Sequence, residues 1–171
     1  MAALDVSLEQ AREAPLEFSG KVPIAARDLD VVGLDGLEPV DVRGEVSFDG
    51  VEFLVRGSVG MEATLECSRC LSPFPFSESS EFDLRLLPRP ESGDKASAAL
   101  EDPDVFFHDG ETAPIDEIVR EQVLMLLPMK PLCREDCRGL CATCGKDLNA
   151  GPCACEAPAG DPRFAVLRGL K

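Results

Sequence analysis

The sequence predicts an α+β fold, in which an antiparallel β-sheet meander carries one principal helix and a cysteine-rich C-terminal segment. Three observations predict it. Apolar residues alternate along residues 40–67, as they do in strands with one buried face. A helical stripe of apolar residues covers residues 114–127. Six of the eight cysteines fall between Cys133 and Cys155, at spacings typical of zinc knuckles.

The length of 171 residues suits one domain, or one domain with a small appendage. We expect residues 1–132 to form the sheet domain, which includes an acidic loop over residues 88–114 and the helix over residues 114–127. We expect residues 133–171 to form a metal-knuckle segment with a basic tail packed on it.

The first forty residues predict a short helix, one strand and a loop. Ser7 is placed to cap a helix over residues 8–14, which Pro15 ends. Residues 28–39 are rich in aspartate and glycine and read as a loop. The strand between the helix and the loop has alternating apolar residues, which are Leu16, Phe18, Val22 and Ile24.

A long hairpin follows. Asp49-Gly50 is a favoured two-residue turn between strands that alternate over residues 40–48 and 51–67. Gly57 and Gly60 predict a bend or bulge in the second strand. The return strand is indicated by Phe74, Phe76, Phe82, Leu84 and Leu86.

Acidic residues, proline and glycine dominate residues 88–114, which predicts a loop with a short strand at residues 105–107. His108, the single histidine, is expected to be a solvated side chain in this loop. Pro114 then suits the first turn of the principal helix, and Pro128 and Pro131 end the helix and direct the chain to Cys133.

The eight cysteines divide into two sets of four by locality. Cys67-Ser-Arg-Cys70 lies at the end of the long strand, and it is expected to meet the first two cysteines of the C-terminal segment. The remaining four are close enough in sequence to form a self-contained knuckle. The first predicted set is Cys67, Cys70, Cys133 and Cys137; the second is Cys141, Cys144, Cys153 and Cys155.

The predicted ligand is Zn²⁺, because this ion prefers tetrahedral sulfur coordination and four-cysteine sites are closed and structural. Either one or two structural ions are expected. Glycines at positions 139, 145 and 151 suit the left-handed backbone of such knuckles. Structural zinc binding is worth roughly 10–16 kcal/mol in small peptides, so metal occupancy would decide whether this segment is ordered.

Four alternatives remain open for these thiols. A thioredoxin-like redox pair prefers a helix start after a strand, whereas Cys67 and Cys70 lie between two strands. A disulfide framework requires an oxidising compartment, for which the sequence carries no signal. An iron–sulfur cluster uses the same kind of ligand. The tight spacing of Cys153 and Cys155 would also fit one free thiol.

Nothing in the sequence predicts an enzyme or a small-molecule substrate. Phosphate-binding loops, serine nucleophile elbows and histidine-based zinc protease motifs are absent. A single histidine supports no catalytic triad, and a closed zinc site has no open position for substrate. Most of the nine phenylalanines occupy strand positions, so they are expected in the core and not in a base-stacking platform.

The net charge of −15 disfavours long-range attraction to nucleic acid. No apolar run has membrane-spanning length, and residues 1–12 are too mixed and acidic for a secretory signal. We therefore expect a cytoplasmic protein with reduced thiols and no membrane partner.

Several motifs, in this order, resemble the bacterial YceD family, the large ribosomal RNA subunit accumulation proteins. They span residues 65–167. The motifs are Leu65-Glu-Cys67-Ser-Arg-Cys70, the helix from Ile115 to Leu124, its exit Leu127-Pro-Met-Lys-Pro-Leu-Cys133, the run from Cys137 to Asn149, and Asp161-Pro-Arg-Phe-Ala-Val-Leu167.

The resemblance implies a non-enzymatic ribosome-biogenesis factor that supports 23S rRNA accumulation or processing and large-subunit assembly. Its expected partner is a large-subunit ribosomal precursor or an assembly protein. Arg134, Arg138 and Lys146 are the expected rRNA contacts, although their simpler role is to neutralise thiolate charge. The alternatives are a thiol-based redox sensor or metal-binding protein, and a protein–protein adaptor without RNA contact.

Overall fold

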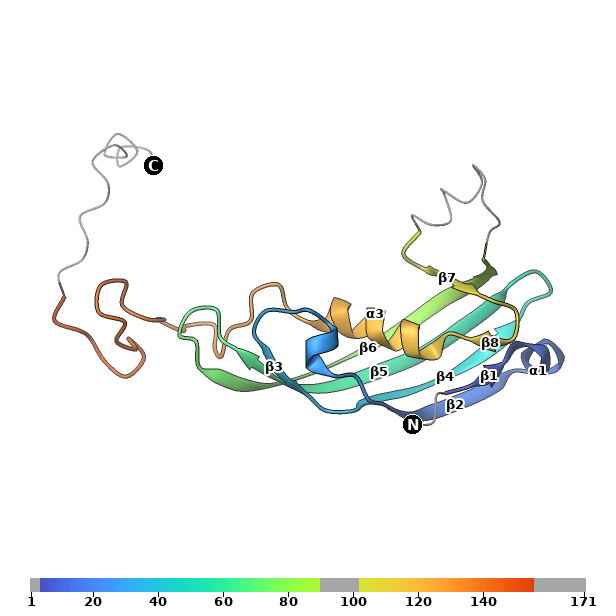
Figure 1. Cartoon of the computed structure of the whole chain (residues 1–171), viewed down its shortest axis with the longest axis horizontal. Coiled ribbons are helices and arrows are strands. Elements are labelled where there is room, and N and C mark those ends of the chain that lie inside the picture. Colours follow the sequence, from blue (N-terminus) through green and yellow to red (C-terminus); the bar gives the residue numbers. More distant parts are fainter. Residues whose placement is uncertain (1–3, 90–101, 156–171) are drawn as a thin grey trace, which may run out of the picture.

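The computed structural model describes residues 4–89 and 102–155 (Figure 1). Most of these residues lie in strands, with few helices, so the fold is α+β as predicted. The main sheet contains β2 (Leu16–Val22), β3 (Leu34–Leu37), β4 (Val40–Phe48), β5 (Phe53–Glu66), β6 (Pro73–Pro88) and β7 (Val105–His108). The remaining elements are β1 (Val6–Ser7), α1 (Leu8–Glu13), η1 (Ala26–Asp28), β8 (Thr112–Ala113) and α3 (Ile115–Leu126).

The main sheet has the strand order β2-β4-β5-β6-β7, and β3 pairs with β5 beyond the start of β4. Neighbouring strands are antiparallel from β2 to β6, as predicted. β7 is parallel to β6, so the prediction of a purely antiparallel meander is wrong at this edge. The reason is that the chain leaves the end of β6 and returns to start β7 beside Arg85, instead of reversing through a tight turn.

One face of the sheet carries the hydrophobic core, and α3 lies across it (Figure 1). Ile115, Ile118, Val119 and Val123 of α3 are buried against this face. At the N-terminus, Ser7 caps α1 as predicted: its hydroxyl accepts a hydrogen bond from the Gln10 N–H at 3.4 Å. β1 and β8 pair with each other in a separate two-stranded ladder.

Gly57 makes no bulge, in contrast to the prediction. It lies directly opposite Gly44, and the β4–β5 and β5–β6 registers are continuous past both glycines. A methyl group on Gly44 would lie 2.7 Å from the Phe18 ring, and one on Gly57 would lie 2.8 Å from the Phe82 ring. The two glycines therefore make room for two aromatic rings on the buried face of the sheet.

The β4–β5 reversal is also shifted from the predicted turn. Phe48 pairs with Phe53, so Gly50 and Val51 are the two central residues of the turn. The prediction, which placed Asp49 and Gly50 at the centre, is wrong by one residue. The Asp49 carboxylate accepts hydrogen bonds from the N–H groups of Val51 at 2.8 Å and Glu52 at 2.9 Å. Asp49 thus stabilises the turn from its flank, through its side chain.

Two predicted loops contain strands. Residues 28–39 include β3, whose four residues are too few to show a clear alternation. In the acidic loop predicted over residues 88–114, the short strand predicted at residues 105–107 is confirmed as β7, whereas β8 was not predicted, and residues 90–101 lie outside the described part of the chain. His108 is buried and not solvated, because it packs edge-on against Phe53 with ring centroids 5.6 Å apart.

After α3 the chain continues through residues 128–155 without helix or strand, apart from one bridge between Leu140 and Asp147. This segment passes the end of the sheet where β5 turns into β6 (Figure 1). The predicted basic tail lies in residues 156–171, outside the described residues. Within the described residues, no helix is long and apolar enough to cross a membrane.

Candidate metal centres

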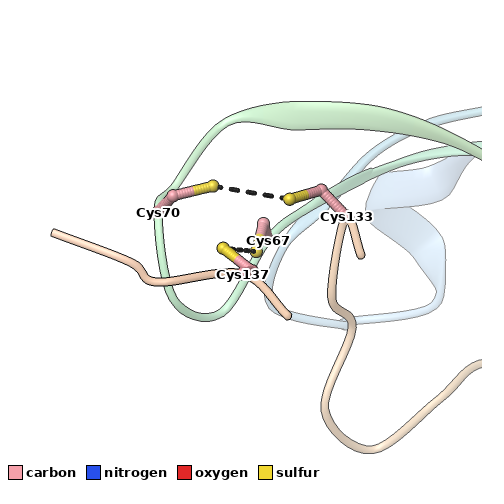
Figure 2. Close-up of side chains that lie close together, drawn as sticks. All are labelled: Cys67, Cys70, Cys133 and Cys137. Carbon is pink, nitrogen blue, oxygen red and sulfur yellow. Dashed lines mark hydrogen bonds between the residues drawn. The ribbon is translucent and has the colours of Figure 1, made fainter. Parts of the chain in front are cut away.

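The turn between β5 and β6 presents Cys67 and Cys70 at the end of the sheet. The Cys67 N–H donates to the Ser72 carbonyl at 3.0 Å, and the Leu71 N–H donates to the Cys67 carbonyl at 2.9 Å. Leu71 has a φ of 57°, a left-handed conformation that a leucine rarely adopts. These contacts fold the turn tightly, so both thiols point to the same side of it (Figure 2).

The segment after α3 is held against this turn by backbone hydrogen bonds. The Ser68 N–H donates to the Pro131 carbonyl at 2.9 Å, and the Leu140 N–H donates to the Arg69 carbonyl at 3.1 Å. The Arg69 guanidinium also donates to the Cys137 carbonyl at 2.7 Å. Cys133 and Cys137 are thereby brought to the two thiols of the turn.

Site I, defined as Cys67, Cys70, Cys133 and Cys137, has all four sulfur atoms within 4.8 Å of one another. Cys67 Sγ lies 3.8 Å from Cys137 Sγ, and Cys70 Sγ lies 3.7 Å from Cys133 Sγ (Figure 2). A tetrahedron with Zn–S bonds of about 2.3 Å has S···S edges of about 3.8 Å, whereas a disulfide needs about 2.0 Å. The spacing fits a shared ion and not disulfides.

Site II, defined as Cys141, Cys144, Cys153 and Cys155, meets the same 4.8 Å limit. Its first half is a tight knuckle, in which the Gly145 N–H donates to the Cys141 carbonyl at 2.9 Å and Gly145 has a φ of 71°. Cys153 Sγ lies 3.4 Å from Cys141 Sγ. Cys155 belongs to the cluster, so its close spacing to Cys153 does not exclude it.

The two sites differ in burial. Cys67, Cys70 and Cys137 are buried and pack with Phe74, Leu132 and Leu140 in a small core of their own. In site II, Cys144 is exposed and the other three cysteines are only half-buried. Site I therefore joins two distant parts of the chain in a sheltered position, whereas site II closes a local loop at the surface.

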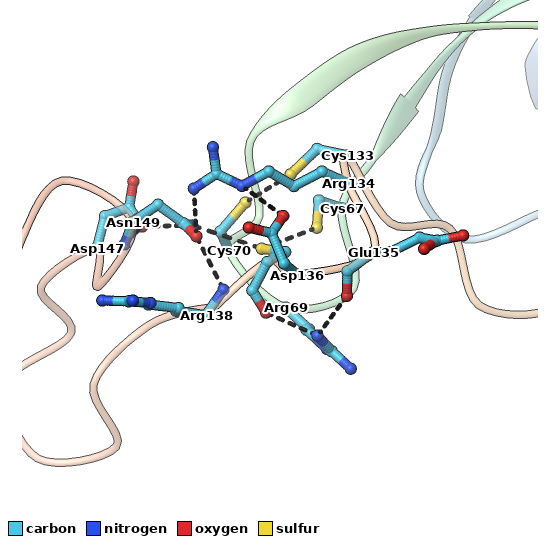
Figure 3. A network of polar contacts seen from close by, with 11 residues as sticks. Cys67, Arg69, Cys70, Cys133, Arg134, Glu135, Asp136, Arg138, Asp147 and Asn149 are labelled. Atoms are coloured by element: carbon cyan, nitrogen blue, oxygen red, sulfur yellow. Dashed lines mark hydrogen bonds and ion pairs between the residues drawn. The ribbon is translucent and has the colours of Figure 1, made fainter.

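Asn149 connects the two sites (Figure 3). Its side-chain Nδ2 donates to Cys137 Sγ at 3.4 Å and to Asp147 Oδ1 at 2.7 Å. Its Oδ1 accepts from the Arg138 N–H at 2.8 Å and from the Arg134 guanidinium at 2.7 Å. A residue from the knuckle of site II thus hydrogen-bonds a sulfur ligand candidate of site I.

In site I the thiols are perturbed in opposite directions. Burial raises the pKa of the Cys67 thiol, but hydrogen bonds from the backbone N–H groups of Cys133 and Cys70 outweigh it and lower this pKa to about 6. Burial, followed by sulfur hydrogen bonds with Cys137 and Cys67, raises the pKa of Cys133 to about 12. Without an ion, the cluster therefore shares protons among its sulfurs.

Site II repeats this division. Backbone N–H groups of Cys144 and Thr143 lower the pKa of Cys141 to about 6. A hydrogen bond with Cys144, together with burial, raises the pKa of Cys155 to about 12. A cation would take the place of the shared protons, because thiolates are the metal-binding form.

The predicted RNA-contact residues have different surroundings. Arg134 is occupied by Asn149 and by an ion pair with Asp136 at 3.4 Å. Lys146 Nζ donates to the Pro152 carbonyl at 2.9 Å, so it supports the knuckle. The guanidinium of Arg138 has no hydrogen bond or ion pair within the described residues, and Figure 3 shows it pointing away from the cluster.

Comparison with protein-family models decides the relationship. The model described as large ribosomal RNA subunit accumulation protein YceD matches residues 55–171, which include both cysteine sites. The chain belongs to the YceD family. The resemblance inferred from the motifs is therefore confirmed.

Relatives in the family come from bacteria and a plant. An uncharacterized protein of Mycobacterium tuberculosis is 33% identical, covering 81% of this chain and 65% of its own length. The maize protein named large ribosomal RNA subunit accumulation protein YCED homolog 1, chloroplastic, is 28% identical, covering 94% of this chain and 61% of its own length. The chain thus spans less than two thirds of either relative. No solved structure gives a significant match.

Sequence reasoning grouped the eight cysteines as the structure does, while their binding of metal stays a prediction. It missed Arg69, which holds the segment after α3 to the β5–β6 turn, and Asn149, which links the two sites. Arg69 lies inside the first Cys-x-x-Cys, and Asn149 follows Asp147 in a Gly-rich knuckle. Their positions between cysteines were the available signal, but their partners become neighbours only in the fold.

Proposed function

We propose that the chain is a non-enzymatic, cytoplasmic ribosome-biogenesis factor that supports 23S rRNA accumulation and large-subunit assembly. The family match supports a ribosome-related role. The printed name of the maize relative refers to large ribosomal RNA subunit accumulation, and we extend that role to this chain. The expected partner is a large-subunit precursor or an assembly protein.

We further propose that sites I and II each hold one structural Zn²⁺. The observation that supports this most is the spacing of the sulfurs, which matches tetrahedral Zn–S geometry in site I. Four thiolates would close each site and leave no coordination position for water or substrate. The function that follows for the metal is to fasten residues 128–155 to the sheet.

Metal analysis of protein purified under reducing conditions tests the zinc assignment. Two equivalents of zinc per chain, with no thiol that reacts before a chelator is added, are expected. Iron and acid-labile sulfide in place of zinc would assign a cluster instead. Metal-free protein with reactive thiols would overturn the proposal.

Arg138 is the candidate contact with rRNA phosphates, because its guanidinium lies beside the two sites and has no partner in the part of the chain that the structure describes. We expect Arg138→Glu to weaken co-sedimentation with large-subunit precursors and to reduce its salt dependence. Arg27→Glu is a matched control, since Arg27 is also exposed but lies in η1 and pairs only with the neighbouring Asp28. If both variants associate equally with large-subunit precursors, Arg138 does not contact rRNA, and the remaining hypothesis is a protein–protein adaptor.

Thiol-based redox sensing is the second candidate, and site II is the observation that favours it. Cys144 is exposed, and Cys141 and Cys153 have sulfurs 3.4 Å apart. If site II senses oxidants, mild peroxide treatment will release one metal and form a disulfide that a thiol reductant reverses. Retention of both metals under that treatment favours the structural role.

A further inference from the structure

The outer edge of β6 is an open hydrogen-bonding edge. Within the described residues, β6 pairs with β5 along Pro73–Leu86, but β7 covers only Arg85–Pro88 on the other side. Figure 1 shows β7 lying against one end of β6. Among residues 4–89 and 102–155, therefore, residues 73–84 have a neighbouring strand on one side only.

The register identifies which backbone groups point outward. The Arg85 N–H donates to the Asp104 carbonyl at 2.9 Å, on the side away from β5. Backbone groups of a strand alternate in direction with a period of two, and the β5–β6 register is continuous. The outward residues are therefore Ser77, Ser79, Glu81 and Asp83.

Local contacts agree with this assignment. Pro73 and Pro75 share the parity of the outward residues, so their missing N–H groups cost the β5 ladder nothing. The Ser79 N–H donates to the carboxylate of its neighbour Glu78 at 3.2 Å, and the Glu81 carbonyl accepts from the Ser80 hydroxyl at 3.0 Å. Side chains thus hydrogen-bond backbone groups of β6 that have no neighbouring strand to pair with among the described residues.

Charge indicates what kind of strand fits. Residues 73–84 contain three carboxylates and no lysine or arginine. Asp83 is paired with Arg56 at 2.8 Å, whereas Glu78 and Glu81 have no ion pair among the described residues, and Glu62 lies across the ladder from Ser77. A second copy of this edge would bring like charges together, so the charge favours a cationic segment of another protein.

The helix adds an apolar side to the same edge. Arg120 donates to the Asp28 carbonyl of η1, which packs on β3, away from β6. By helical spacing, Glu121 and Met125 lie on the flank of the buried stripe of α3 opposite to Arg120, so we infer that they face the β6 side. The Met125 side chain is 73% exposed and is available to apolar residues of an added strand.

We propose that residues 77–83 of β6 accept an extended segment of a partner protein by β-strand addition, and that this segment alternates cationic and apolar residues. Its backbone would pair with the outward groups of β6. Its cationic side chains would lie beside Glu81 and could reach across Ser77 toward Glu62 of β5, and its apolar side chains would face Met125. This inference names a protein-docking edge and does not depend on the metal or RNA assignments.

The test uses the full, metal-loaded chain and a synthetic peptide of alternating lysine and valine. Hydrogen exchange should slow at the amides of Ser77, Ser79, Glu81 and Asp83 when the peptide is added. The amides between them, already paired with β5, should not change. The same peptide with N-methylated backbone keeps the charge but cannot form the ladder, so it should bind at least about tenfold more weakly.

Ser79→Pro removes an outward N–H. Pro73 and Pro75 already occupy equivalent outward positions of β6, so the β5–β6 ladder should survive. It should weaken the lysine–valine peptide about tenfold, whereas Ser79→Ala, which keeps the N–H, should bind normally. Thermal melting and the exchange of β4–β5 amides verify that both variants are folded.

Four results would overturn the proposal. Protection of the outward amides before any peptide is added would mean that the edge is already covered. If the Ser79→Pro variant or the N-methylated peptide binds as tightly as the unmodified pair, the peptide is held by charge attraction and not by backbone pairing. Absence of peptide binding removes the site, and protection that rises with protein concentration, together with a dimer mass, assigns the edge to a second copy.

Discussion

The side-chain amide of Asn149 donates a hydrogen bond to Cys137 Sγ at 3.4 Å, across the boundary between the two cysteine sites. Hydrogen bonds to sulfur reduce the negative charge that a four-thiolate centre must carry, and contacts of this kind tune metal affinity. Asn149 also accepts hydrogen bonds from the backbone of Arg138 and the side chain of Arg134. The knuckle of site II therefore supports site I.

Asn149→Asp should accelerate metal release from site I. The new carboxylate still accepts from the Arg138 N–H, but it cannot donate to Cys137 Sγ and it adds negative charge near thiolates. We expect metal affinity at site I to fall about 10–100-fold. Chelator competition measures it, and Lys146→Ala, which removes a different knuckle contact, is the control. Equal release rates in both variants would contradict the coupling of the sites.

Loss of one ligand should have unequal effects in the two sites. Cys137→Ser should remove one metal equivalent and detach residues 128–155, because site I fastens this segment to the β5–β6 turn. Cys144→Ser should also remove one equivalent but leave the attachment intact, since site II closes a surface loop. We expect the attachment to lose more than about 3 kcal/mol only in Cys137→Ser.

Limited proteolysis after Leu127 measures this attachment, with metal content determined on the same samples. Equal protection of the two variants would show that backbone contacts such as Ser68 to Pro131 hold the segment without site I.

Gly57→Ala should destabilise the sheet. Its Cβ would lie 2.5 Å from the Arg43 carbonyl oxygen, which cannot move without the backbone, and 2.8 Å from the tip of the Phe82 ring, which would have to shift within the core. We expect a loss of about 1–3 kcal/mol in the free energy of unfolding, measured by denaturant titration. Gly60→Ala, three residues along the same strand, meets nothing within 4 Å and should be nearly neutral. A similar loss in both variants would point to strand propensity instead of contact.

Acidification should weaken the β7 end of the sheet through His108. Burial, and next the charge of Arg12, lowers the pKa of His108 below its ordinary value of 6.5, against the opposing effect of Asp109. His108 therefore binds a proton more readily in the unfolded chain than in the folded one. The stability that neutral His108 contributes to the fold is complete above pH 6.5 and declines as the pH falls. Protonation of Nδ1 would also break its hydrogen bond from the Gly110 N–H.

Denaturant midpoints between about pH 7.5 and about pH 5.5 measure this effect. His108→Gln removes the titrating group, so its stability should depend less steeply on pH over the same interval. Parallel curves for the two proteins would show that carboxylates elsewhere cause the dependence.

Local patterns predicted much of this fold because they report directly on burial. Alternation along residues 40–67 identified β4 and β5, and the stripe from Ile115 to Leu126 identified α3 to within a residue. The grouping of the cysteines followed from their spacing, since four ligands within fifteen residues are able to form a self-contained knuckle.

The features that the sequence did not predict depend on neighbours that are distant in sequence. A glycine inside a strand indicates a bulge when that strand is considered alone. The reason for Gly57 is instead the close approach of Gly44 and of the Phe82 ring on neighbouring strands. The direction of β7 is likewise not encoded in its four residues, because it depends on where the chain re-enters the sheet. His108 appeared solvated because its burying partner, Phe53, is more than fifty residues away.

Site I takes two ligands from the β5–β6 turn and two from beyond α3, so it can be completed only after most of the chain has left the ribosome that makes it. Until then, each half presents a pair of thiols that can hold an ion only weakly. If site I binds metal as proposed, metal shortage during synthesis would yield a folded sheet whose residues 128–155 are not fastened to the β5–β6 turn and are open to proteolysis. The supply of metal would in this way set how much of the protein survives, before it acts on any partner.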